Sequence, residues 1–311
     1  MLIDDEKHAA EFLEAVSFFR LTPYMRPFQH NTDAAHEFRS GTRMSSLTRL
    51  YDFDRRLRLL VMDAVEHIEV AARAALSNYM GPHHGAHWYM DPRVFRHDFR
   101  HQALIDTILR KQEISRRDYE RECSRIDQSN TLQTRITQLK KARRKESYAR
   151  HYGLTYDQPA LMPGWAAMEE ITFGELSHLF KGLARATDKK AVARTWGLPA
   201  PLVESWLHTL TTVRNICAHH ARLWNRELGI RPELAKAASC LGPAAMHKAG
   251  APARIFTIVC IITLLIRRIR PMAGWEEALH ILILDFPDVD LTAMGFPMDW
   301  RQDIFWGAVR C

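Results

Sequence analysis

Hydrophobic residues recur at helical spacing along most of the chain. Residues 47–79 carry one long apolar stripe, and residues 5–20, 99–125 and 275–284 repeat the same period over shorter lengths. Further helices are predicted at residues 131–152, at 164–183 with an interruption near Gly174, and around 255–266. Since no run of alternating apolar and polar residues indicates a strand, the pattern predicts an all-α fold.

A central helix is predicted at residues 201–228, closed by Gly229 and Pro232. At about 100° per residue its polar side chains fall into one row and its apolar side chains into another. An amphipathic helix that buries the apolar row must present the polar row to solvent, to a cleft or to a partner subunit. The polar row consists of Asn215, His219, Arg222 and Arg226, and the apolar row of Trp206, Leu210, Val213, Cys217 and Trp224.

Composition indicates an ordinary globular protein of 311 residues, with 47% hydrophobic and 25% charged residues. We expect a single all-α domain over residues 1–311. The five cysteines lie far apart without a CxxC pair, which argues against a disulfide framework and favours a reducing compartment. The start of the chain lacks the pattern of a signal peptide, and the apolar run at 255–266 is shorter than the roughly 20 residues that cross a bilayer. We therefore expect a cytoplasmic protein without a membrane partner.

Positive charge is concentrated in residues 110–150. This segment holds thirteen Lys or Arg and six acidic residues, so its excess equals the net charge of +7 of the whole chain. Such a local excess predicts binding to nucleic acid, mainly through phosphates, although a solvated face laced with ion pairs is the alternative. The candidate phosphate-binding residues are Arg116, Arg117, Lys140, Lys141, Arg143, Arg144 and Lys145, together with Arg222 on the central helix, for which a solvated charge is an equal alternative.

Arg214, Asn215 and His219 suit the metal-free cleavage of RNA. The ribose 2′-hydroxyl is the nucleophile in this reaction, so the enzyme supplies an acid or base and a cation. Histidine exchanges protons near neutral pH, and arginine can fork onto the scissile phosphate. Asn215 could orient either group. One helix carries too few groups for a full site, so we expect two such helices to face each other across a homodimer axis.

A series of motifs along the chain resembles the Abi-like family of bacterial abortive-infection proteins (AbiD/AbiF type), which belongs to the HEPN superfamily. The spacing of Arg214 and His219 matches the R-x(4-6)-H signature of that superfamily. The motifs are FRLTPY at 19–24, LYDFDRRLR at 50–58, IEVAAR at 68–73, Glu146 with His151 and Tyr152, FGELS at 173–177, RNICAHHARLWN at 214–225 and MGFP at 294–297.

The resemblance implies a HEPN-like helical bundle at about residues 42–230, followed by a C-terminal helical extension at about 231–311. It also implies dimerisation, ribonuclease chemistry and a role in defence against phage. Some relatives are associated with a small non-coding RNA, which would give the basic segment a ligand. We expect no cofactor.

Several polar residues have structural alternatives. His220 falls toward the predicted buried side, where a hydrogen-bonded core histidine is expected. Glu69 and Arg73 have the spacing of an ion pair and are expected to support the fold, with an orienting role toward Arg214 as a hypothesis. The histidines at 83, 84, 87, 97 and 101 lack the carboxylate or cysteine context of a zinc site, so no metal is predicted.

Two functions from different classes fit these patterns. The first is a metal-independent endoribonuclease that leaves a 2′,3′-cyclic phosphate, with His219 as acid or base and Arg214 stabilising the phosphate. The second is a module that binds a structured non-coding RNA without turnover. A third hypothesis is that exposed tyrosines are targets of a partner nucleotidyltransferase. Only the first predicts cleavage that survives EDTA.

Overall fold

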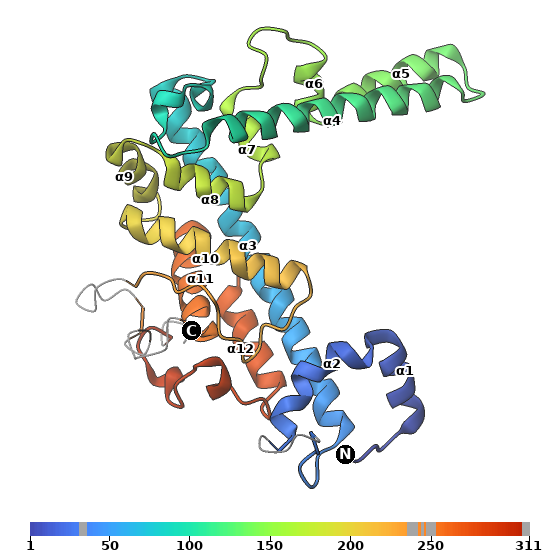
Figure 1. The fold of residues 1–311 in the computed structure, drawn as a ribbon, viewed down its shortest axis with the longest axis vertical. Helices are drawn as coiled ribbons and strands as arrows, with labels where there is room; N and C mark the ends of the chain where they lie inside the picture. Colours follow the sequence, from blue (N-terminus) through green and yellow to red (C-terminus); the bar gives the residue numbers. More distant parts are fainter. Residues whose placement is uncertain (31–35, 235–241, 244–245, 247–252, 307–311) are drawn as a thin grey trace. The chain divides into compact units, whose positions relative to one another are not determined.

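The computed structural model describes residues 1–30, 36–234, 242–243, 246 and 253–306. Within these residues the chain forms helices and short 3₁₀ turns and no β-strand, which confirms the predicted all-α fold (Figure 1). The chain divides into two compact units, one of Met1–His67 with Thr212–Cys311 and one of Ile68–Thr211. This boundary differs from the predicted one between a core at 42–230 and an extension at 231–311, and the single domain stays a prediction.

The first unit contains the N-terminal and C-terminal helices. Its elements are α1 (Glu6–Val16), α2 (Phe18–Met25), the first part of α3 (Met44–His84), the end of α10 (Ala200–Ala218), α11 (Ile255–Ile269) and α12 (Trp275–Asp285). Every residue of α11 from Ile255 to Ile266 is buried, so this helix forms the centre of the unit. The Trp275 indole N–H donates to the Thr263 hydroxyl at 2.8 Å, which joins α12 to α11.

The second unit contains the remaining helices. They are the rest of α3, α4 (His101–Asp127), α5 (Gln133–Arg144), α6 (Tyr148–Gly153), α7 (Gly164–Glu170), α8 (Phe173–Gly182), α9 (Ala186–Arg194) and most of α10. Within this unit α5 lies alongside α4, so the two form a helical hairpin (Figure 1). The predicted break near Gly174 is present at Ile171 and Thr172, where Thr172 caps α8 and accepts a hydrogen bond from the Glu175 backbone N–H at 3.3 Å.

Three of the predicted helices have wrong boundaries for local reasons. The helix predicted at residues 131–152 is divided into α5 and α6, since α5 ends at Arg144 and the Ser147 side chain caps the start of α6. The helix predicted at residues 5–20 breaks at Ser17, which has a φ of +66° and separates α1 from α2. The long helix predicted to end near residue 79 continues to His84, before Gly85 with a φ of +91°. Helix α9 was not predicted. Cys240, Cys311 and part of the expected C-terminal extension lie outside the described residues.

The predicted ion pair between Glu69 and Arg73 is present in the second unit. Arg73 is buried, and its guanidinium also donates to the Met168 carbonyl at 2.7 Å and to the Ile171 carbonyl at 3.0 Å. These carbonyls lie at the end of α7, which has no further helical turn to accept from them. Arg73 therefore ties the last turn of α7 to α3.

Replacing Arg73 by Ala is expected to lower the free energy of unfolding by about 3–5 kcal/mol, because buried carbonyls and Glu69 lose their donor. Urea unfolding followed by circular dichroism measures this change. The variant Lys190→Ala on α9 is a control, since Lys190 is exposed. A loss below about 1 kcal/mol in Arg73→Ala would contradict the tethering role.

Whether Glu69 also orients Arg214 stays a prediction. Full cleavage with normal melting in Glu69→Ala would contradict it.

Candidate functional site

The central helix α10 ends at Ala218, ten residues before the predicted end. His219 and His220 form a turn, and His220 and Asn225 adopt left-handed backbone conformations with φ of +56° and +48°. The predicted helical row of Asn215, His219, Arg222 and Arg226 is therefore wrong beyond His219. The apolar residues after the turn are still buried, because Leu223 and Trp224 pack into the core without being helical.

A buried carboxylate determines where α10 ends. The Asp54 side chain on α3 has no exposed surface and accepts backbone hydrogen bonds from Leu223 at 3.0 Å and Trp224 at 2.6 Å. It also accepts from the Tyr24 hydroxyl at 2.5 Å and from the buried Arg58 guanidinium. A carboxylate so bonded holds the segment after α10 in a fixed, non-helical path.

The electrostatics of this cluster follow from its burial. Burial raises the pKa of the Asp54 carboxyl, while the Tyr24 hydrogen bond, the Arg58 charge and the two backbone N–H donors act in the opposite direction. Burial, followed by the Asp54 charge and hydrogen bond, raises the pKa of Tyr24 well above its usual range. Burial also raises the pKa of Cys217 to about 12, so this thiol stays protonated at neutral pH.

Two arginines join the segment after α10 to helix α2. Arg20 Nη1 donates to the His220 carbonyl at 2.8 Å, and Arg222 Nη1 donates to the Pro23 carbonyl at 3.1 Å. Burial lowers the pKa of the half-buried Arg222, as do the charges of Arg226 and Arg26, but an arginine remains cationic at neutral pH. Both guanidinium groups are therefore held in place by backbone acceptors.

A cavity of about 780 Å³, open to solvent, lies between α2 and the turn after α10. Arginine, histidine and one exposed phenylalanine dominate its wall, and Glu227 is its acidic member. The lining residues are Ser17, Phe19, Arg20, Pro23, Tyr24, His219, His220, Ala221, Arg222, Arg226 and Glu227. A cavity with this lining can accommodate an anion together with a flat apolar group.

The three predicted catalytic residues lie at the C-terminal end of α10, with Arg214 and Asn215 inside the helix and His219 directly after it. Asn215 and His219 are exposed and Arg214 is partly exposed, and Arg214 Nη1 donates to Asn215 Oδ1 at 3.4 Å. The His219 N–H bonds to the Asn215 carbonyl at 3.0 Å, so the turn is helical up to this point. His219 lines the cavity, and Arg214 lies five positions earlier, about 140° away around the helix axis. All three side chains are accessible to a ligand.

His220 does not occupy the predicted core position. Its side chain is exposed, and its backbone carbonyl, rather than its imidazole, accepts the hydrogen bond from Arg20. The reason is the left-handed conformation at His220, which turns the chain out of the helix before the residue can reach the buried face. The structural support predicted for the His220 side chain is therefore supplied by its backbone.

In the second unit, ion pairs neutralise part of the basic segment. All six acidic residues of 110–150 pair with bases, so Arg116, Arg117, Lys140 and Arg143, predicted to bind phosphate, each have a carboxylate partner. Arg144 donates to the Leu154 carbonyl at 2.8 Å. Among the described residues no carboxylate lies within ion-pair distance of the remaining bases of the segment, which are Arg110, Lys111, Arg125, Arg135, Lys141, Arg144 and Lys145.

The remaining bases are mostly exposed on the α4–α5 hairpin. Lys141, Arg144 and Lys145 were predicted as phosphate-binding residues, whereas Arg110, Arg125 and Arg135 were not singled out. The pairs at i,i+3 or i,i+4 spacing could be read from the sequence, whereas the pairs of Asp127 with Lys140 and of Glu122 with Arg150 join residues far apart and could not. The residues around Asp54 were likewise missed as site residues. One feature of the sequence could have indicated them: Asp54 is a carboxylate beside Phe53 and near Leu57, in a helix whose apolar face is predicted to be buried.

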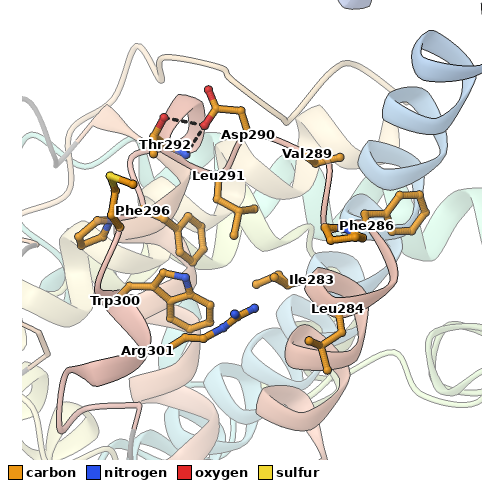
Figure 2. A pocket seen from close by; sticks show the side chains of 13 residues that line it. Ile283, Leu284, Phe286, Val289, Asp290, Leu291, Thr292, Phe296, Trp300 and Arg301 are labelled. Carbon is orange, nitrogen blue, oxygen red and sulfur yellow. Dashed lines mark hydrogen bonds between the residues drawn. The ribbon is translucent and has the colours of Figure 1, made fainter. Parts of the chain in front are cut away.

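A second cavity in the first unit, of about 360 Å³, has a different lining (Figure 2). Leu291, Ile283 and Phe286 make it largely apolar, and Arg301 crosses the Trp300 ring with its guanidinium carbon 5.3 Å from the ring centroid. The Asp290 carboxylate accepts from the Thr292 N–H and hydroxyl, at 2.8 and 2.6 Å. Its one acidic side chain is thus already engaged, and the catalytic candidates do not line this cavity.

The described residues contain no group of three or more His, Cys, Asp or Glu side chains that could hold a metal ion. In the same part of the chain, no helix combines the length and apolarity needed to cross a bilayer.

The chain matches the Abi-like protein family over residues 11–225. No curated protein and no solved structure matches the chain significantly. The matched range covers more than two thirds of the chain and includes α2, Asp54, Arg73 and the turn after α10. Family membership supports a role in abortive infection. The chain belongs to the Abi-like protein family.

Proposed function

We propose that this protein is a metal-independent endoribonuclease of the HEPN type that acts in an anti-phage abortive-infection system. The observation that carries the proposal is the accessible group of Arg214, Asn215 and His219 at the C-terminal end of α10, next to a cavity rich in arginine. This group has one cation, one amide and one proton-transferring side chain. The cavity adds the positive charge that a polyanionic substrate requires.

The reaction needs an acid, a base and a cation, and solvent water can exchange the one proton that His219 does not transfer. The 2′-hydroxyl loses its proton to a base, and its oxygen forms a bond to phosphorus. The bond from phosphorus to the 5′ oxygen breaks, and the departing oxygen takes up a proton. His219 performs one of these proton transfers, and Arg214 stabilises the charge that grows on the phosphate oxygens. The products are a 2′,3′-cyclic phosphate and a 5′-hydroxyl.

A homodimer would complete the site. Arg214 and His219 leave α10 about 140° apart, so one helix does not readily direct both onto a single phosphate. Two copies of α10 that face each other would place Arg214 of one protomer near His219 of its partner. Sedimentation equilibrium tests this arrangement, and mixing Arg214→Ala with His219→Ala protein should restore part of the activity in mixed dimers if the site is shared.

A non-catalytic RNA-binding module is the second candidate, favoured by the exposed bases without carboxylate partners on α4 and α5. A single assay separates the candidates. The full chain is incubated with labelled RNA in EDTA, with binding measured in parallel. The ribonuclease predicts cleavage that survives EDTA. Salt-sensitive binding with intact RNA would instead establish the binding module, for which a dedicated non-coding RNA is the expected partner.

A triple variant is expected to bind RNA more weakly and with less dependence on salt. In it, glutamine replaces Arg135, Lys141 and Lys145. For single-stranded RNA, the slope of log K against log salt should decrease by about 0.7 for each phosphate that the variant no longer neutralises. The matched control, Arg185, Lys190 and Arg194 replaced by glutamine, removes the same charge from α9 and its N-terminus. Equal slopes for the two triple variants would show that net charge, rather than the α4–α5 hairpin, determines binding.

A further inference from the structure

The cavity beside His219 contains an exposed aromatic side chain that the proposed chemistry does not use. Phe19, on the first turn of α2, is 85% exposed, and Phe18 next to it is 58% exposed. Phe19 lines the cavity, and Phe18 is not among the lining residues. A flat ligand that covers this ring removes its apolar surface from water, which favours binding.

Fixed cations lie on the wall of the same cavity. Arg20 is bonded to the His220 carbonyl and Arg222 to the Pro23 carbonyl, and Arg226 donates to the Arg222 carbonyl at 3.3 Å. Each guanidinium keeps further N–H groups, because an arginine has five donors. Three arginines against Glu227 leave the lining cationic. Groups already held in place lose little conformational freedom when they bind a phosphate.

Aromatic surface beside fixed cations matches a nucleotide whose base is unpaired. Bases stack on aromatic side chains when they are splayed out of a helix, while the backbone phosphates follow a positive groove. The cavity volume of about 780 Å³ lies within the range of roughly 300–1,000 Å³ found for small-molecule sites. A base inside a duplex is stacked on both faces and cannot cover Phe19.

We propose that Phe19 stacks on an unpaired base next to the scissile phosphate, while Arg20 and Arg222 contact phosphates of the same strand. The site would therefore select single-stranded RNA. This assignment rests on the proposed function insofar as RNA is the polyanion, but it concerns binding and does not require turnover. Arg20 has a second role, since its contact with the His220 carbonyl positions the turn that carries His219.

The test compares Phe19→Ala with Phe18→Ala in binding a single-stranded 2′-O-methyl oligoribonucleotide, which cannot be cleaved through its 2′ oxygen, and the matching duplex. Phe19→Ala should weaken single-strand binding about tenfold or more and leave duplex binding unchanged. Phe18→Ala should weaken single-strand binding less than Phe19→Ala, because the Phe18 ring contacts the Phe19 ring edge-on at 6.1 Å between centroids but does not line the cavity. Phe19→Trp should retain single-strand affinity. Melting curves of all variants verify folding, which Phe19 should not affect because it is exposed.

Three results would overturn the assignment. The first is an equal loss in Phe19→Ala and Phe18→Ala, and the second is no binding of the single strand by the unaltered chain. The third is a changed oligomeric state in Phe19→Ala, which would place the ring in a protein interface. If the ribonuclease proposal fails and the Phe19 assignment holds, the unaltered chain will bind single strands through Phe19 and leave cleavable RNA intact.

Discussion

Replacing His219 by Ala is expected to lower the rate constant of RNA cleavage in EDTA by about 10²–10⁴-fold, because general acid–base catalysis contributes this much. Arg214→Ala should lower it by about 10²–10³-fold through the loss of charge stabilisation on the phosphate. Single-turnover cleavage of labelled RNA measures both effects. Neither variant should unfold more easily, since both side chains reach the surface.

The control for this pair is His280→Ala, which removes an exposed histidine of α12 in the same unit. It should cleave at the rate of the unaltered chain. Arg214→Lys is informative as well, because lysine keeps the charge but loses the planar fork, and it should retain only part of the activity. Full cleavage by both His219→Ala and Arg214→Ala would place the chemistry elsewhere in the molecule.

Replacing Asp54 by Ala is expected to lower the free energy of unfolding by about 3–5 kcal/mol, the cost of leaving a buried charge unpaired. Arg58 would lose its carboxylate, and the backbone N–H groups of Leu223 and Trp224 would lose their acceptor. Cleavage should fall further than stability alone explains, because the path after α10 is no longer fixed. Chemical denaturation and activity under folding conditions measure the two effects.

Asp52→Ala is the matched control, since Asp52 lies one half-turn away on α3, is about half exposed and pairs with Arg55 at 3.8 Å. This exposed pair should contribute less than about 1 kcal/mol. The free energy of unfolding of Asp54→Asn should lie between those of Asp54→Ala and the unaltered chain, because the amide oxygen of Asn can still accept from one backbone N–H. Equal stability of the Asp54 and Asp52 variants would mean that the buried cluster does not hold the turn.

Hydrophobic periodicity was sufficient to predict the helical fold. The stripe of α3 and the apolar run of α11 are strong local patterns, and both helices are present. The early end of α10 could not be predicted, because it depends on Asp54, which is far away in sequence and captures the Leu223 and Trp224 N–H groups. A helical period that continues through residues 219–228 looks the same whether or not such a distant acceptor exists.

The candidate site was predicted only in part. The spacing of Arg214, Asn215 and His219 is local, so the sequence places them close together, and the structure has them accessible at the end of α10. The cavity beside them depends on α2, almost two hundred residues away, and on hydrogen bonds from Arg20 and Arg222 to backbone carbonyls. Backbone acceptors of this kind cannot be identified from residue types. The ion pairs of Asp127 and Glu122 with bases outside α4 are equally non-local, whereas the pairs within α4 have helical spacing that the sequence shows.

The chemical nature of the cleaved ends tests the central claim most directly. Purified full chain is incubated in EDTA with an RNA oligonucleotide and with the same oligonucleotide carrying a single 2′-deoxyribose at the preferred cleavage position. We predict a 2′,3′-cyclic phosphate and a 5′-hydroxyl from the first substrate and no cut at the substituted position in the second. Cleavage of both at equal rates, or ends with a 5′-phosphate, would contradict it.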